Sequence, residues 1–296
     1  MDALAPRDPP YVMDGLSLDA VRAVQARPQF RDAVRASAQA SIDAYHGGRL
    51  MSWIMSDRAR SLLGYVAYYL ELAGGAGLTP TRVKQVCAEL GFCSPGRGAA
   101  MLALMRASGY VALVTDPTDK RVRRLAATDK LKEMLQSRLA PQIAAGAMVM
   151  PALRGVPERL KDGPFERALV RWFGERFMQG HRMLVHAPDL FLFAEHNAGM
   201  VILFNLLLSG APGDAFPPRG PVQTSVAGLA RRFKVSRTHV LRVLRAAERQ
   251  GHIKRTADHY DGVILQPHLT QGVMDLFATL YLFFEHGVNA ANAKAK

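Results

Sequence analysis

The sequence has very few cysteines, with only Cys87 and Cys93 among 296 residues. So small a number excludes a disulfide-rich secreted scaffold and gives no sign of an oxidising compartment. Both cysteines stand where the surrounding pattern calls for small apolar residues, so we expect buried free thiols. A redox switch is the alternative interpretation of the pair.

Long apolar runs are missing as well. The most apolar segments, 199–208 and 273–284, are shorter than the ~20 residues that a membrane-spanning helix needs. Residues 1–16 are rich in Pro and Asp and lack the basic and apolar regions of a signal peptide. The sequence therefore predicts a cytoplasmic protein.

Acidic residues are scarce relative to basic ones. The chain holds 25 Asp and Glu against 38 Lys and Arg, which gives a formal net charge of +13 and a pI near 10.1. Its hydrophobic content of 49% is typical of a folded protein, and its length suits about two domains. The charge predicts a polyanionic partner, with nucleic acid as the first candidate and an anionic membrane surface as the second.

Sequence motifs of common enzyme classes are also absent. The chain contains no Gly-rich phosphate-binding loop and no nucleophile elbow. Its nine histidines are scattered, and His181, His186 and His196 lack a metal-ligand spacing with nearby cysteines or carboxylates. We therefore expect no catalytic residues, no bound metal and no cofactor.

A helix-turn-helix pattern occupies residues 226–255. Apolar residues recur at i, i+3, i+4 and i+7 over 226–233, which predicts a short helix with one buried face. Ser236 is placed to cap a second helix, Gly251 to end it, and 252–256 to form the first strand of a wing. The exposed face of the second helix carries side chains that suit base edges and phosphates, and the alternative is a solvated basic helix. The predicted DNA contacts here are Ser236, Arg237, Thr238, His239, Arg242 and Arg245.

The same pattern occurs earlier, over residues 79–126. Ser94 is placed to cap the second helix and Gly109 to end it, and two strands around a polar turn follow as a wing. This helix has a single long polar side chain near its start, whereas the wing is rich in Lys and Arg. The predicted DNA contacts here are Ser94, Arg97, Lys120, Arg121 and Arg123.

The two halves therefore predict a division of labour. We expect the first to hold DNA mainly through its wing, in the minor groove or on phosphates, and the second to recognise bases in the major groove. A solvated charged hairpin is the alternative for the first wing. Because side chains alternate between the faces of a strand, Arg121 and Arg123 share one face and Arg124 takes the other, so not all the basic residues can touch DNA.

The two patterns form an internal repeat. When the two halves are aligned at one constant spacing, the four basic positions of the first wing correspond to uncharged residues in the second half. These are Gly262, Val263, Leu265 and Gln266. Five anchor pairs are each separated by 142 residues: Ser94 and Ser236, Gly109 and Gly251, Asp116 and Asp258, Asp119 and Asp261, and Thr128 and Thr270.

The expected fold is mainly α with small β wings, in which two tandem winged helix-turn-helix domains are joined by a helical bundle. The repeat predicts a pseudo-twofold arrangement in which one chain supplies both protomers of a dimer. The expected divisions are an N-terminal arm and short helix (1–27), a helical segment with the first winged helix-turn-helix (28–139), a linker (140–163), a helical segment with the second (164–288), and a frayed tail (289–296).

Three short segments of the first half carry a family resemblance: GYV at 109–111, DPTDKR at 116–121 and ATDK at 127–130. Together they resemble the MarR family of bacterial transcription regulators, over about residues 55–139. The resemblance implies a wing in the minor groove, with Arg121 as its best contact, and a preceding helix in the major groove, with Ser94 and Arg97 as candidates. The chain departs from the family's usual form in carrying two such domains.

The predicted function is that of a sequence-specific, double-stranded-DNA-binding transcription regulator. Two alternatives stay open: a plasmid-type replication initiator with two winged helices, and a winged-helix protein that binds a protein partner or has an architectural role. A homodimer through the terminal helices also stays open. The aromatic residues within 53–69 and 172–177 suit either a plain core or a small-molecule effector pocket, and their helical spacing favours the core.

Overall fold

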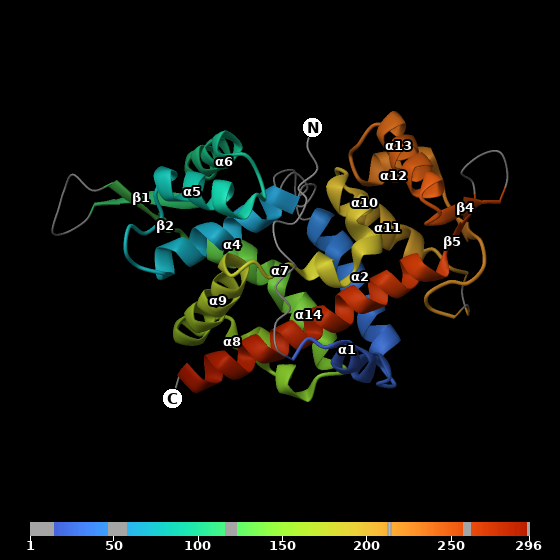
Figure 1. Cartoon of the computed structure of the whole chain (residues 1–296), viewed down its shortest axis with the longest axis horizontal. Helices are drawn as coiled ribbons and strands as arrows, with labels where there is room; N and C mark the ends of the chain where they lie inside the picture. Colours follow the sequence, from blue (N-terminus) through green and yellow to red (C-terminus); the bar gives the residue numbers. More distant parts are fainter. Residues whose placement is uncertain are drawn as a thin grey trace.

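The computed structural model describes residues 15–46, 58–115, 123–211, 213, 215–256 and 262–294. Within these residues the protein is mainly helical, with two small antiparallel sheets (Figure 1). This confirms the expected mainly α fold with small β elements. Two blocks of helices and strands lie at the two ends of the long axis, and the long helix α14 (Pro267–Lys294) runs diagonally below them.

One order of elements, helix–helix–helix–hairpin–helix, occurs twice. In the first half it comprises α4 (Arg58–Leu72), α5 (Pro80–Leu90), α6 (Pro95–Ala107), β1 (Val111–Thr115), β2 (Arg123–Ala127) and α7 (Asp129–Ala147). In the second half it comprises α11 (Gly199–Leu208), α12 (Val226–Arg232), α13 (Arg237–Arg249), β4 (Ile253–Arg255), β5 (Gly262–Leu265) and α14, with a short strand β3 (Val222–Gln223) before α12. We call residues 78–127 the first unit and residues 222–265 the second unit.

The remaining elements connect and support these units. They are α1 (Leu18–Gln25), α2 (Phe30–His46), η1 (Pro151–Leu153), α8 (Val156–Arg159), α9 (Gly163–Met178), η2 (Met183–His186), η3 (Pro188–Leu190) and α10 (Phe191–Glu195).

The second helix of each unit begins and ends where the sequence predicts. The hydroxyls of Ser94 and Ser236 each accept the backbone N–H three residues on, at 3.3 and 3.1 Å. Gly109 and Gly251 end the two helices in left-handed conformations, with φ of +73° and +75°. In both halves the residue after the glycine donates its N–H back to the last turn of the helix at 2.8 Å, which is a Schellman motif. Helix length and the start of each hairpin are thus set locally.

The hairpins are antiparallel. Val111 lies opposite Ala127 in the first unit, and Ile253 lies opposite Leu265 in the second. A third strand, β3, pairs with β5 in the second unit, and an isolated bridge at Leu78 occupies the corresponding edge of the first.

This pairing corrects the predicted register of the repeat. The opposed residues are 16 apart in the first hairpin and 12 apart in the second, so the second hairpin is four residues shorter. The partner of Thr128 is therefore Gln266, and the predicted match with Thr270 is wrong. Thr128 donates its N–H to the carbonyl of Tyr110 at 3.0 Å, and Gln266 makes the same bond to His252 at 2.9 Å.

The correction also changes which wing positions match. In the new register Gly262 corresponds to Arg124, whereas the earlier register had placed Gln266 there. The anchors at 116, 119, 258 and 261 lie outside the described residues. A hairpin turn tolerates a change in length because its residues are on the surface and make few packing contacts.

Residues 140–163 are not a linker. Helix α7 continues through Pro141 to Ala147, and η1 and α8 follow it. A proline inside a helix costs about 3 kcal/mol. Burial of a large apolar side chain contributes about 1.5–3 kcal/mol, and Ile143, Val149 and Leu153 in this segment are all buried. Packing therefore outweighs the local signal for a break.

The predicted frayed tail is also wrong as far as Lys294, because α14 extends that far. Val288 and Ala291 on its last turns are buried, which anchors the end of the helix.

Two helices cross between the halves. Helix α2, from the first half, packs against α7 and also against α11 of the second half. Helix α9, from the second half, packs against α14 and also against α4 of the first half. A buried hydrogen bond of 2.7 Å between the hydroxyls of Ser37 and Tyr281 joins α2 to α14. Each half therefore contributes one helix that packs against the other half, and these contacts join the two halves.

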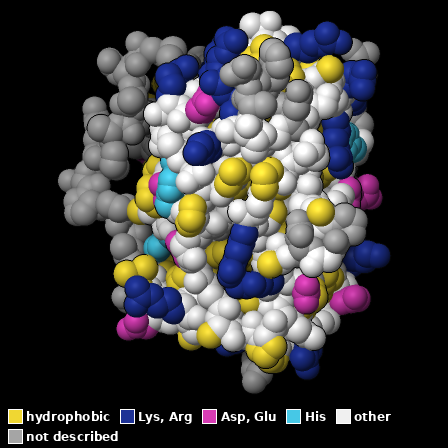
Figure 2. Space-filling model, turned by 90° about the vertical axis from the view of Figure 1, so that its right-hand side faces the viewer, with side chains coloured by type: hydrophobic (Ala, Val, Ile, Leu, Met, Phe, Trp, Pro, Cys, Tyr) yellow, Lys and Arg dark blue, Asp and Glu magenta, His cyan; other side chains and the backbone are white. Residues whose placement is uncertain are grey.

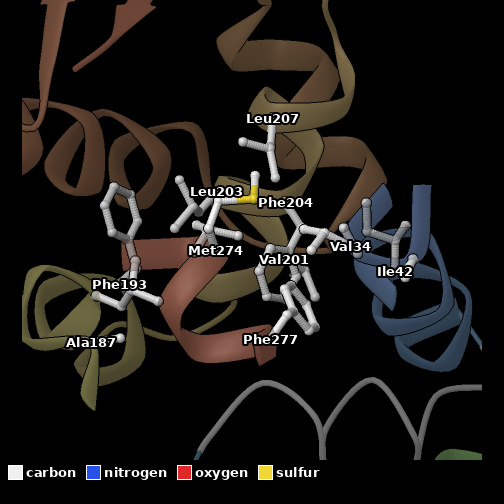
Figure 3. Close-up of a cluster of buried hydrophobic side chains, with 14 of the residues drawn as sticks. Val34, Ile42, Ala187, Phe193, Val201, Leu203, Phe204, Leu207, Met274 and Phe277 are labelled. Carbon is white, nitrogen blue, oxygen red and sulfur yellow. The ribbon is translucent and has the colours of Figure 1, made fainter. Parts of the chain in front are cut away.

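The apolar side chains of α2, α10, α11 and α14 meet in one buried cluster (Figure 3). The second unit shares this cluster, whereas the first unit has a core of its own between α4, α5, α6, α7 and its hairpin. Trp172 and Phe173 of α9 each pack against Phe283 with ring centroids 5.0 Å apart, so these aromatic residues belong to the core as expected. The side chains labelled in the figure are Val34, Ile42, Ala187, Phe193, Val201, Leu203, Phe204, Leu207, Met274 and Phe277.

Within the described residues, no single helix has the length and apolar character needed to cross a membrane. One pair, Pro188–Glu195 with Gly199–Leu208, meets that test only when taken together, and it is bent by 117°.

Candidate nucleic-acid interface

Helix α13 buries one face and exposes the other. Four apolar residues at helical spacing are buried in the second unit: Val240, Val243, Leu244 and Ala247. The polar residues that the sequence singled out lie on the other side. Ser236, Arg237, Thr238, Arg242 and Arg245 are exposed, and His239 is half-buried.

His239 is held by its own protein. Because the carbonyl of Asn197 can only accept, the ring Nε2–H donates to it at 2.7 Å, which leaves Nδ1 as an acceptor. That nitrogen accepts an N–H of Arg242 at 2.7 Å. The imidazole therefore orients the guanidinium of Arg242, and both of its nitrogens are engaged in the free protein. A direct contact of His239 with DNA stays a prediction.

The surface around α13 is strongly basic. Residues 221–256 contain nine Lys and Arg and a single acidic residue, Glu248, which pairs with Arg255 at 2.7 Å. Figure 2 shows Lys and Arg side chains gathered along the upper edge of this end of the molecule, where the second unit lies. Such a concentration of one charge attracts a polyanion and raises its rate of encounter. The exposed basic residues of this segment are Arg231, Arg232, Lys234, Arg237, Arg242, Arg245, Arg249 and Lys254.

Five of these residues were not among the predicted contacts: Arg231, Arg232, Lys234, Arg249 and Lys254. Lys234 lies in the turn between α12 and α13 with φ of +53°, in the left-handed region, and its side chain is exposed beside the start of α13. Their charge is visible in the sequence. The periodicity of α13 could not indicate four of the five, because only Arg249 belongs to that helix.

Helix α6 presents a different surface. Ser94 and Arg97 are exposed at its start, as the predicted contacts require. Further along, the exposed face is mostly apolar, and Leu104 is 41% exposed. Such side chains offer base edges no hydrogen-bond donors, so base recognition by α6 is confined to its first turn. The exposed residues beyond that turn are Ala100, Ala103, Leu104, Arg106 and Ala107.

The two thiols lie beside α6. Cys87 is buried and Cys93 half-buried, both free, with their sulfur atoms 3.4 Å apart. Burial, together with the neighbouring Cys93 thiol, raises the pKa of Cys87 to about 12. The thiolate is the reactive form of cysteine, so Cys87 is an unreactive packing residue, as the sequence led us to expect.

The basic wing of the first unit is described in part. Lys120 and Arg121 lie outside the described residues, and the backbone of Arg123 pairs with Thr115 at the end of the hairpin. Arg124 is half-buried, and its Cδ passes 3.6 Å from the position that a Cβ on Gly77 would take. Its stem therefore packs on the protein.

The two units face the same way. Helices α6 and α13 lie along one edge of the molecule, and the two hairpins lie at its opposite ends (Figure 1). The two helices with the predicted contacts therefore lie on the same side of the molecule.

Comparison with known proteins gives this chain no relative: no family model, no curated protein and no solved structure matches it.

Proposed function

We propose that the protein is a sequence-specific transcription regulator that binds double-stranded DNA through two winged helix-turn-helix domains, the first and second units. The exposed side of α13 carries this proposal. Arg237, Thr238, Arg242 and Arg245 project from a short helix whose other side is fixed in the core. Guanidinium groups donate in pairs to guanine, and an α-helix of this width fits the major groove.

The division of labour follows from the contrast between the two units. Helix α6 has an apolar exposed face beyond its first turn, whereas the wing that follows it is basic. The first unit would hold DNA through its wing, as the MarR-like segment implies, and α13 would supply most of the base recognition.

The crossing of α2 and α9 supports a single-chain pseudo-dimer. Homodimers with closed symmetry bury the same elements reciprocally against each other, and here one chain makes both of the reciprocal contacts. We infer that one chain binds one DNA site composed of two unlike half-sites, without a second copy.

Binding of the purified chain to fluorescent duplexes tests the proposal. Duplexes selected from genomic fragments, including the chain's own promoter, are compared with random duplexes across a salt series. Preference for a selected site should persist as salt weakens both complexes, since phosphate contacts account for the salt dependence and base contacts for the preference. Equal affinity for selected and random duplexes at every salt concentration would refute sequence-specific binding.

Two variants separate the proposed roles. Arg237→Ala should cost ~1–3 kcal/mol on the selected site and less on random DNA, whereas Arg121→Ala should weaken both and lower the salt dependence by about one phosphate contact. Arg22→Ala is the matched control, because Arg22 is exposed on α1, on the lower side of the molecule (Figure 1), and its loss removes the same charge. Equal losses for all three variants would leave only net charge as the cause of binding.

A further inference from the structure

Three side chains that are far apart in the sequence meet at the base of the second unit. They are Asp189 in η3, His252 directly before β4, and His268 in the first turn of α14. One ligand atom from each lies within 4.8 Å of the others, and the nitrogens His252 Nδ1 and His268 Nε2 are 3.0 Å apart. Ligands of a tetrahedral zinc ion at ~2.0–2.1 Å from the metal are separated from each other by roughly 3.3 Å. The two imidazoles are thus already at the separation of two ligands of one ion.

The backbone holds His252 in place. Its N–H closes the Schellman motif of α13, and its carbonyl accepts the N–H of Gln266 at 2.9 Å. The amide oxygen of Gln250 lies 3.2 Å from Nε2 and can only accept, so Nε2 carries the proton and the Nδ1 lone pair faces His268. A hydrogen bond that fixes the tautomer in this way is usual for a metal-bound histidine.

Asp189 packs directly on α14 beside Gly272. Gly272 lies one turn after His268 on the same face of α14, and a Cβ added to it would lie 3.4 Å from the Cβ of Asp189. This packing of η3 on α14 brings the carboxylate to the two imidazoles.

The corresponding positions of the first unit do not carry this cluster. In the corrected register Tyr110 corresponds to His252, and Lys130 corresponds to His268. There the ammonium of Lys130 lies over the ring of Tyr110, 4.7 Å from its centroid. The same arrangement of helix, hairpin and following helix thus forms with a cation–π contact at these positions, so its packing does not require two histidines.

We propose that Asp189, His252 and His268 form a binding site for a divalent transition-metal ion of the zinc type. Two imidazole nitrogens and one carboxylate oxygen suit zinc and its neighbours in the first row and do not suit magnesium or calcium, which take oxygen ligands. Three protein ligands leave a fourth position for water or another donor. The ion would join the end of α13, the start of α14 and η3, and so brace the second unit against the central helices. The site stands independently of DNA binding.

Cobalt(II) is the probe of choice because its visible absorption reports tetrahedral coordination. The full chain, free of any affinity tag and treated with chelator, is titrated with Co(II) and then with Zn(II). We expect one Co(II) per chain with the absorption of a four-coordinate site, its displacement by Zn(II), and a higher thermal midpoint for the metal-loaded chain.

The first unit provides the matched variant. His268→Lys places the residue of the first unit at an exposed position, and His252→Tyr with His268→Lys restores its whole pair. Both should lose Co(II) affinity by ~100-fold or more, as should Asp189→Asn, whereas His286→Gln removes a histidine elsewhere and should bind like the parent.

The proposal fails if the parent chain binds no Co(II), or if His268→Lys binds as tightly as the parent. It also fails if His286→Gln loses affinity as the cluster variants do. Far-UV circular dichroism establishes that each variant is folded. Should the double variant not fold, His268→Lys alone decides the matter, because its side chain is exposed.

Discussion

The contact between His239 and Arg242 yields a quantitative prediction. Loss of Arg242 should cost ~1–3 kcal/mol on the selected DNA site, which corresponds to a ~5- to 150-fold loss of affinity. The hydrogen bond of 2.7 Å from Arg242 to His239 Nδ1 orients that guanidinium, and Asn197 holds the imidazole from its other side. A hydrogen bond to a charged group contributes about 1.5–3 kcal/mol when buried. Arg242 is exposed, so solvent reduces this to ~0.5–1 kcal/mol.

His239→Ala should therefore weaken binding ~2- to 5-fold in the parent chain and have no effect in an Arg242→Ala background. Fluorescence anisotropy with the selected duplex, applied to both single variants and the double variant, gives the coupling energy directly. The two residues act as a unit if the cost of the double variant equals that of Arg242→Ala alone.

Additive losses would refute this reasoning. They would mean that His239 contacts DNA by itself, as the sequence pattern first indicated, or that it acts through some other residue. The orienting role of His239 would also be contradicted if His239→Ala bound the selected duplex as tightly as the parent chain does.

Two stability predictions follow from the packing, both measured by urea unfolding. A Cβ on Gly98 would lie 2.4 Å from the sulfur of Cys87, so Gly98→Ala should destabilise the protein by ~1–3 kcal/mol; the same change at Gly96 on the same helix meets nothing within 4 Å and should be neutral or stabilising by up to ~1 kcal/mol. Tyr281→Phe should cost ~1–3 kcal/mol because it leaves the buried hydroxyl of Ser37 without that partner, and Ser37→Ala in the same chain should recover part of the loss. Equal effects at the two glycines, or no recovery in the double variant, would contradict these assignments.

The boundaries of the helices in the two units could be predicted because they depend on nearby residues. Ser94 and Ser236 supply the cap, and Gly109 and Gly251 supply the left-handed residue that ends the helix. Each of these effects acts within about one turn of the chain, so the sequence alone carries it. The mainly helical fold with small hairpins follows from the same local rules.

The segment 140–163 could not be predicted because its structure depends on distant partners. Its prolines and glycines indicate a break, yet Ile143 and Leu153 are buried in the core that α2, α11 and α14 share. A local pattern gives the cost of Pro141 in a helix but not the apolar surface that offsets it.

The repeat register failed for a related reason. Matching residues at one fixed spacing assumes hairpins of equal length, and the coincidence of Thr128 with Thr270 satisfied that assumption by chance. Hydrogen bonds across the hairpin, from Thr128 and from Gln266, are the observation that identifies the true partners.

The exposed face of α13 was largely predictable from the sequence, and the cluster of Asp189, His252 and His268 was not. Arg237 and Arg242 follow from helical periodicity, because the buried face of α13 determines which face is exposed. His252 and His268 are separated by a hairpin, and Asp189 is much earlier in the chain, so no ligand spacing marked them. Only the packing of η3 on α14 brings the carboxylate to the imidazoles.

The presence of both halves in one chain allows matching positions to differ. In a homodimer one gene sets both recognition helices, so a change that improves one alters the other as well. Here α6 carries alanine and leucine where it is exposed while α13 carries arginine, and Tyr110 with Lys130 in one half corresponds to His252 with His268 in the other. The reciprocal packing of α2 and α9 is nevertheless the same in the two halves. On the proposed function, this frees one unit to hold the DNA backbone and the other to recognise bases, and the site bound by the chain should lack the symmetry of a palindrome.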